Sequence, residues 1–266
     1  MTDDLRELLT KVAAGEVDPA EAARLIDGEA IATSSWGGAP ADETEETGEP
    51  DASATAVEAA VTAVEIRAEG VQLRVIADHG ITGAVAEGPH TAELVGGVLR
   101  VRVPAADGLG FYFGRIKQGW IRPTRVDVRV RPDLPVSVDA IACDVQVSGL
   151  TGPLDLRASA SSAKVRDQRG AFAAAVTTSK LDVEASLVAG DSTVRAELSS
   201  ALVRLLPGSD VAVTASGEMS SAQVTGAGST PKSQQGTGER QTGVVGLGAA
   251  SLDVTGRGSA LKVQLP

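Results

Sequence analysis

The spacing of apolar residues changes near residue 57 of this 266-residue chain. Before that point apolar residues recur every three or four positions, which is the period of an amphipathic helix. After it they alternate with polar residues in short runs separated by glycine-containing turns, which is the pattern of β-strands. The change of period predicts a small helical part followed by a mainly β body at 57–266.

Residues 1–28 are predicted to form a hairpin of two short helices. Thr2 and Asp18 can cap the two helices, Pro19 suits a first helical position, and Gly28 suits an end. Two helices this short are not stable alone and would leave an apolar stripe in water. The stripe consists of Leu5, Leu8, Leu9, Val12, Leu25 and Ile26. We expect it to drive homo-oligomerisation.

The stretch 29–56 is predicted to be a disordered acidic linker, because it is dense in acidic, Pro, Gly, Ser and Thr residues and poor in apolar ones. Residues 1–56 carry the whole net charge of −11, so the body at 57–266 is formally neutral. A neutral body lacks the positive charge with which proteins hold nucleic acid. Nucleic acid is therefore an unfavoured partner.

Inward-facing positions in the β body repeat at intervals of 18 to 21 residues. The sets are Cys143/Val145/Val147, Ala163/Val165, Leu181/Val183, Ala201/Val203/Leu205 and Ala222/Val224, with Leu261/Val263/Leu265 after an interval of 39. Two strands in each repeat predict a right-handed parallel β-solenoid, or β-helix, whose turns stack on one another. An aromatic content of 2% suits its narrow core.

Three parts of the body need separate predictions. The strands at 57–135 are irregular in spacing, and the doubled interval before the last set predicts a flexible loop at 228–243. The last strand, within 260–266, is expected to be the open end of the solenoid. Its unpaired edge would compete with the hairpin as a self-association surface.

Paired serines recur near the inward sets and raise the question of a nucleophile. A nucleophilic serine needs a base within reach, and the two histidines lie outside the repeats. At a solenoid corner, by contrast, a small hydroxyl can satisfy backbone groups where the chain bends. We therefore predict no catalytic residue. The expected corner positions are Ser162, Ser179, Ser200, Ser221 and Ser259.

The sequence indicates no metal or cofactor site. His79 and His90 fall in separate turns without a clustered third ligand. Cys143 is the sole cysteine and alternates in phase with Val145 and Val147, which predicts a buried, inert thiol.

The segment 111–131 has the composition of a binding surface. It holds four of the six aromatic residues and six bases against a single acid, Asp127. The favoured interpretation is an aromatic plug with a solvated basic edge. The alternative is a binding strip for anionic lipid head groups, nucleic acid or the acidic linker. The strip consists of Arg115, Lys117, Trp120, Arg122, Arg125, Arg129 and Arg131.

The run RVDVRVRPDLPVSVDAIACDVQVSGLTGPLDLRASASSAKV at 125–165 resembles the bacterial putative-adhesin β-strand-repeat family, a domain of unknown function. The stretch 66–103 is similar to the N-terminal part of actinobacterial-type members, and GEVDPAEAARLIDG at 15–28 is similar to a helical hairpin that accompanies the family. The resemblance covers about 60–266, although the family's Gly-Ser-Gly-Asp corner is replaced by Ser-Ser-Ala-Lys. It implies a bactofilin-like β-helix, oligomerisation through the hairpin, no catalytic residue, and an envelope-stress or regulatory role.

The sequence therefore predicts a non-enzymatic scaffold or regulatory protein that self-associates through 1–28 and needs no cofactor. One alternative is a peripheral binder of anionic membranes or nucleic acid that uses 111–131. Another is a carbohydrate-active β-helix enzyme, which would need clustered carboxylates and aromatic platforms that the repeats lack.

The expected location is the cytoplasm, with weak peripheral contact at the inner face of the membrane as a further expectation. The N-terminal stretch is acidic and has no signal-peptide pattern. No apolar run approaches the roughly 18 residues needed to cross a bilayer.

Overall fold

The computed structural model describes residues 55–57, 61–104, 124–230, 233–235 and 238–266. The described residues all belong to one compact unit, Gly48–Pro266. The predicted hairpin at 1–28 and the linker up to residue 54 lie outside the described residues. Strand β1 (Thr55–Val57) begins two residues before the predicted start of the body.

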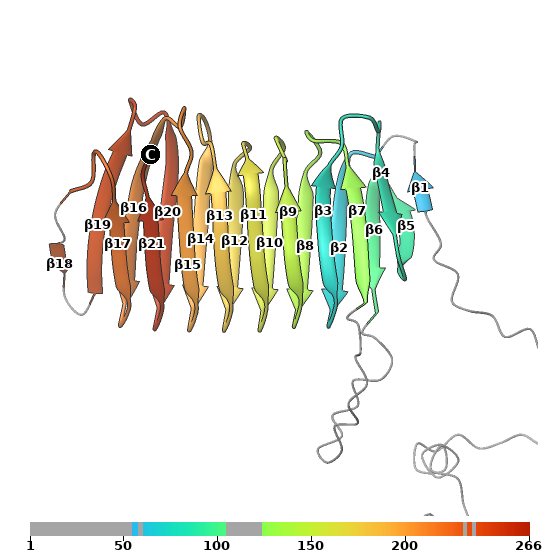
Figure 1. The fold of residues 1–266 in the computed structure, drawn as a ribbon, viewed down its shortest axis with the longest axis horizontal. Coiled ribbons are helices and arrows are strands. Elements are labelled where there is room, and N and C mark those ends of the chain that lie inside the picture. The colour runs from blue at the N-terminus through green and yellow to red at the C-terminus, as the bar shows by residue number, and fades with distance from the viewer. Residues whose placement is uncertain (1–54, 58–60, 105–123, 231–232, 236–237) are drawn as a thin grey trace, which may run out of the picture. The chain divides into compact units, whose positions relative to one another are not determined.

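The body is mainly β and consists of two sheets, each mixing parallel and antiparallel pairs (Figure 1). Sheet A has the strand order β1, β4 (Ala84–Glu87), β7 (Arg125–Val130), β3 (Gln72–Ala77), β9 (Asp144–Ser148), β11 (Ser162–Gln168), β13 (Lys180–Ala185), β15 (Ser200–Leu205), β21 (Ala260–Gln264) and β17 (Ser221–Thr225).

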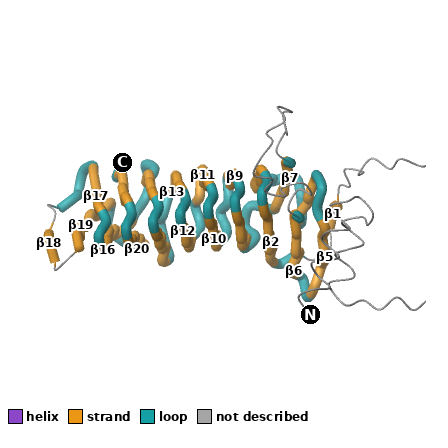
Figure 2. Tube along the Cα trace, turned by 90° about the horizontal axis from the view of Figure 1, so that it is seen from below, coloured by secondary structure: helices purple, strands orange, loops and turns teal. Residues whose placement is uncertain are grey.

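Sheet B lies opposite sheet A (Figure 2). Its order is β18 (Ser233–Gln235), β19 (Gly238–Val245), β16 (Val211–Glu218), β20 (Ala250–Arg257), β14 (Asp191–Glu197), β12 (Phe172–Thr177), β10 (Leu154–Ser159), β8 (Val136–Ile141), β2 (Ala63–Glu69), β6 (Val98–Val103) and β5 (Thr91–Val95).

The chain passes repeatedly from sheet B to sheet A, and we call one strand of sheet B with the strand of sheet A that follows it a rung. Neighbouring rungs pair in parallel in both sheets: β10 pairs with β8 and β12, while β11 pairs with β9 and β13. The strands at 57–135, predicted to be irregular, include the rungs β2–β3 and β6–β7, which pair in parallel like the others.

The rungs are not stacked in chain order at either end. At the N-terminal end, β2–β3 lies between β6–β7 and β8–β9. At the C-terminal end, β20–β21 lies between β14–β15 and β16–β17, so the C-terminus falls inside the row of strands (Figure 1). The prediction of an open end at 260–266 is therefore wrong, because β21 has a parallel partner on both sides.

The space between the sheets is filled by small aliphatic side chains. Alternate residues of each strand are buried, as in β7, where Val126, Val128 and Val130 are fully covered while Arg125, Asp127 and Arg129 face outward. Phe172 is the sole aromatic residue of the buried core in the described residues. The predicted narrow core of Val, Leu and Ala is thus confirmed, and its regular alternation fixes which face of each strand is inside.

One predicted register is wrong. Val145, not Cys143, lies beside Ala163, so the first repeat interval is 18 residues instead of 20. Cys143 comes just before β9 and aligns with Ser161 at the corner. Both residues are buried, and a two-residue period cannot distinguish a strand position from a corner position two residues earlier.

At the end of the body that is formed by β16 and β17, an antiparallel segment is added to sheet B. Strand β19 pairs with β16 along eight residues, from Glu218 opposite Gly238 to Val211 opposite Val245, and β18 pairs with β19. The predicted loop at 228–243 therefore contains a strand in its second half. The segment is predicted from sequence to be a loop because its residues are mostly polar. They are polar because side chains on one face of β19 are exposed, and because a buried position of this strand is occupied by a polar residue, Gln241.

The described ranges contain strands and turns and no helix. None of the described residues forms a helix long and apolar enough to cross a membrane.

Candidate functional site

The turns that lead from sheet B to sheet A form a continuous hydrogen-bonded column, which we call the corner ladder. In stacking order it consists of Cys143, Ser161, Ser179, Ser199, Ser259 and Ser220. Each serine Oγ accepts the backbone N–H of the preceding ladder residue at 2.8–3.1 Å. Each also donates to the carbonyl two residues earlier in its own chain at 2.6–3.0 Å.

The ladder corrects three of the predicted corner serines. Ser179 and Ser259 occupy the ladder as predicted, whereas Ser162, Ser200 and Ser221 are the first residues of β11, β15 and β17. In each serine pair it is the hydroxyl of the first serine that joins the ladder. Each ladder hydroxyl accepts one hydrogen bond from the backbone and donates another to it. Its hydrogen-bonding capacity therefore serves to hold neighbouring rungs together.

The residue before each ladder position has a left-handed backbone. These residues are Ala142, Ala160, Thr178, Leu198, Gly258 and Met219, with φ between 49° and 60°. This conformation is uncommon outside glycine, so the sharp turn requires compensation. The ladder hydroxyl supplies it by pairing the backbone groups that the turn leaves free.

Cys143 begins the ladder, and its Sγ lies 3.2 Å from the carbonyl oxygen of Ile141, as a serine hydroxyl would. Burial raises the pKa of the thiol above its ordinary value of 9.0, and nearby backbone hydrogen bonds oppose that shift. The thiol is therefore protonated and covered, which is the state expected of a structural cysteine rather than a reactive one.

The two histidines lie in separate turns. His79 is exposed, while Nδ1 of His90 lies 2.7 Å from the carbonyl oxygen of Gly88 and so carries a proton toward it. No three His, Cys, Asp or Glu side chains among the described residues come together as a metal site requires.

The described part of the 111–131 strip is engaged in ion pairs. Arg125 binds Asp127 with 2.9 Å between Nη2 and Oδ2, and this contact raises the pKa of Arg125. Arg129 pairs with both Glu87 and Asp78. These acids come from the strip's own strand, from β4 and from the turn after β3, so the described arginines lie on a locally neutral surface.

Arg131, the last arginine of the strip, lies just after β7. Its Nε donates to Asp133 at 2.6 Å, and its guanidinium lowers the pKa of that carboxyl. A second donor, Nη1, reaches the carbonyl oxygen of Thr82 at 3.0 Å. The remaining strip residues, Arg115, Lys117, Trp120 and Arg122, lie outside the described residues, as do the hairpin residues Leu5, Leu8, Leu9, Val12, Leu25 and Ile26.

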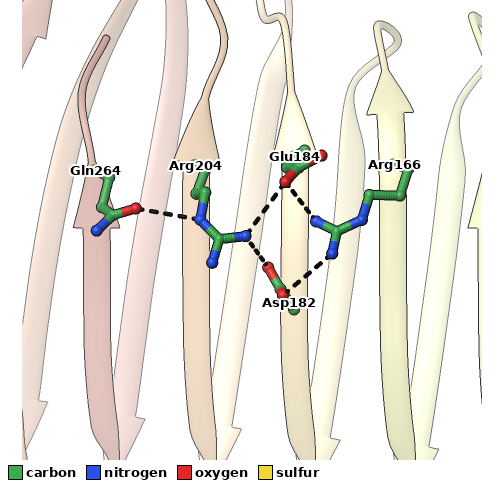
Figure 3. Close-up of polar contacts among 5 residues, drawn as sticks. All are labelled: Arg166, Asp182, Glu184, Arg204 and Gln264. Carbon is green, nitrogen blue, oxygen red and sulfur yellow. Dashed lines mark hydrogen bonds and ion pairs between the residues drawn. The ribbon is translucent and has the colours of Figure 1, made fainter.

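The outer face of sheet A carries a cluster of two carboxylates between two arginines (Figure 3). Asp182 and Glu184 project from β13; Arg204 of β15 reaches both, at 2.9 and 3.2 Å, and Arg166 of β11 reaches both, at 3.4 and 2.6 Å. Arg204 Nε also donates to Gln264 of β21 at 3.2 Å. The charges are mutually satisfied, so the cluster joins four neighbouring strands and offers no free acid or base.

The outer face of sheet B holds a groove of about 640 Å³ near its C-terminal end. It crosses β14, β20, β16 and β19. It is lined by Arg195, Ala196, Glu197, Thr214, Ser216, Gly217, Glu218, Glu239, Arg240, Asp253, Thr255, Gly256 and Arg257. Arg195 and Arg240 stand at its two sides, and the short side chains of Thr255 and Ser216 lie between them. Sequence analysis missed the groove, because its strands are neighbours only through the out-of-order stacking.

The last strand of sheet A has its outer edge covered by side chains. Glu239 Oε2 accepts the N–H of Ala222 at 3.2 Å, and Gln241 Oε1 accepts the N–H of Val224 at 2.7 Å. Both acceptors come from β19. An uncovered strand edge is a template for pairing with another chain, so these contacts oppose such pairing along this edge of sheet A.

No family model and no curated protein sequence matches this chain. A solved structure described as a "putative cell adhesion protein" from Clostridium sporogenes is similar to it, with 10% sequence identity and a TM-score of 0.45. The match covers 82% of this chain and 100% of the other.

Proposed function

We propose that this protein is a non-enzymatic scaffold that self-associates through residues 1–28. Its β body would be a right-handed parallel β-solenoid, with each rung as one turn. The main support for the proposal is that the recurring serine hydroxyls of the corner ladder are engaged with the backbone. Each accepts an N–H from the neighbouring rung and donates to a carbonyl of its own rung. Such groups serve rigidity rather than catalysis, since a nucleophile needs a free hydroxyl beside a base.

Two further features support this role over its alternatives. The edge of β17 is covered by Glu239 and Gln241, which disfavours end-to-end stacking at the C-terminal end and leaves the apolar stripe of 1–28 as the preferred contact. The described arginines of the 111–131 strip already face acids, so an anionic membrane or nucleic acid would have to displace existing ion pairs. The proposal includes a cytoplasmic location and a regulatory role in envelope stress.

Light scattering on the full chain tests the proposal. We expect the double variant Leu8→Glu/Leu9→Glu to lower the oligomeric mass, because buried charges oppose association of the stripe. Leu247→Glu is the matched control: Leu247 is 95% exposed on the body, so the same chemical change there should leave the mass unaltered. An unaltered mass in the double variant would refute association through the hairpin.

A further inference from the structure

A row of charged residues along the groove of sheet B lies beside a row of exposed apolar residues. Glu197, Arg257 and Glu218 are direct neighbours across β14, β20 and β16, and all three line the groove. The next residues in the chain are Leu198, Gly258 and Met219. Leu198 and Met219 are 70% and 73% exposed.

Among the residues that directly precede the ladder, the large apolar side chains are Leu198 and Met219, both beside the groove. At the equivalent positions away from the groove the chain has Ala142, Ala160 and Thr178, which are small. Leu198 and Met219 share the same left-handed backbone, with φ of 49° each, where glycine would be more favourable. Exposed apolar groups in water and a disfavoured conformation both oppose this choice of residue, so a role in binding explains it better than a role in folding.

The charges of the groove differ from those on sheet A. Among the described residues, the side chains of Arg195, Arg257 and Glu197 form no ion pair, although acids and bases line the same groove. On sheet A, in contrast, Arg166 and Arg204 each hold two carboxylates. The groove therefore presents charges of both signs that can bind a ligand without breaking existing pairs.

We propose that this surface binds an extended polypeptide segment of a partner protein in which apolar and charged residues alternate. Successive side chains of an extended peptide point to opposite sides. A segment that lies across β14, β20 and β16 can place its apolar side chains against Leu198 and Met219. Its charged side chains then face the acid–base–acid row of Glu197, Arg257 and Glu218. A polyanion fits less well, because the lining holds four acids against three arginines and no aromatic platform.

Fluorescence anisotropy on the full chain tests this proposal. The probe is a labelled peptide in which leucine alternates with lysine and glutamate in turn, compared with a scrambled peptide of the same composition. We expect the alternating peptide to bind more tightly. Leu198→Gly/Met219→Gly should weaken that binding about tenfold or more, because it removes the apolar contacts. Glycine suits the left-handed backbone, so the variant should fold, and Thr178→Gly is the matched control at the same corner position.

Three outcomes would overturn the proposal. Equal binding of the alternating and scrambled peptides would show that the pattern is not recognised. Unchanged binding in Leu198→Gly/Met219→Gly, with the fold confirmed by circular dichroism, would place the peptide elsewhere. Heparin binding that Arg195→Gln/Arg257→Gln abolishes, with no peptide binding in the wild type, would make the groove a polyanion site. Self-association through 1–28 is measured separately by light scattering and does not affect these readouts.

Discussion

Gln241 on β19 accepts the backbone N–H of Val224 on β17, with 2.7 Å between Oε1 and N. Its Nε2 donates to the carbonyl oxygen of Thr230 at the same distance. Gln241 is 8% exposed; its bond to Val224 is buried, while its bond to Thr230 is partly buried. One side chain thus binds the edge of sheet A beside Glu239 and also holds the segment that leads to β18 and β19.

Gln241→Leu should lower the free energy of unfolding by about 2 kcal/mol, because it leaves the buried N–H of Val224 without an acceptor. Urea denaturation followed by circular dichroism measures the change. Gln223→Leu is the control, since Gln223 lies on β17 with an exposed side chain. Equal losses in the two variants would contradict the assigned role of Gln241.

Ser179→Ala should cost about 1–3 kcal/mol of stability, because the N–H of Ser161 loses its acceptor inside the body. Ser200→Ala should change stability by about 0.5 kcal/mol or less, since Ser200 is exposed at the start of β15. Thermal unfolding of both variants provides the comparison. If Ser200→Ala abolished a biochemical activity while the fold persisted, the assignment of these serines to structure would be wrong.

Cys143 should make stability depend on pH in the alkaline range. Its pKa is raised by burial in the folded state, so the unfolded chain loses the thiol proton first. The protonated thiol of Cys143 therefore contributes fully to the free energy of unfolding at pH values below the pKa of the thiol in the unfolded chain. This contribution is lost as the pH rises from there through the pKa of the thiol in the folded protein. Denaturation midpoints measured across this range should fall in the wild type.

Cys143→Ser is the matched variant for this effect. Serine at position 143 continues the corner ladder with the residue type found at Ser161 and beyond, so the fold should persist. The variant removes the thiol and should flatten the alkaline decline relative to the wild type. Parallel pH profiles for the two proteins would show that Cys143 does not cause the decline.

Asp182→Asn should cost about 1 kcal/mol, and added salt should reduce the difference from the wild type. The Asp182 side chain is 14% exposed and contacts both Arg166 and Arg204, so its charge is partly shielded from solvent. Asp253→Asn in the groove is the control, and we expect no comparable loss. A salt-independent cost at Asp182 would point to packing instead of charge.

Removal of residues 249–266 should destabilise the body far beyond the loss of two strands. This segment supplies β20 and β21, which join β14 and β15 to β16 and β17. Hydrogen exchange should show lost protection in β16 and β17 and preserved protection in β10 and β11. Retained protection of β16 in the truncated chain would mean that it stacks on β14 directly.

Local pattern determined much of the fold. The alternation Val126–Val128–Val130 against Arg125–Asp127–Arg129 identifies the buried face of β7 from sequence alone, because side chains of a strand alternate with a period of two. The mainly β class and the small aliphatic core follow from the same pattern. The corner role of Ser179 was also predictable, because a small hydroxyl at a sharp bend can pair the backbone.

The alignment of one rung with the next was not fixed by that pattern. Cys143 and Val145 are both buried, and it is the pairing of Val145 with Ala163, together with the bond from the N–H of Cys143 to Ser161, that places the cysteine at the corner. In the same way, either serine of the pair Ser199–Ser200 could turn inward until the register of β15 was known.

The tertiary structure alone decided the order of the rungs. Strands with the same alternation present similar edges and similar inward faces, so nothing in the residues of β21 requires it to lie between β15 and β17. That order brings Arg257 between Glu197 and Glu218 and so assembles the groove. The sequence determined the faces of the strands, because side-chain alternation is local, while their neighbours depend on contacts between distant segments that share the same pattern.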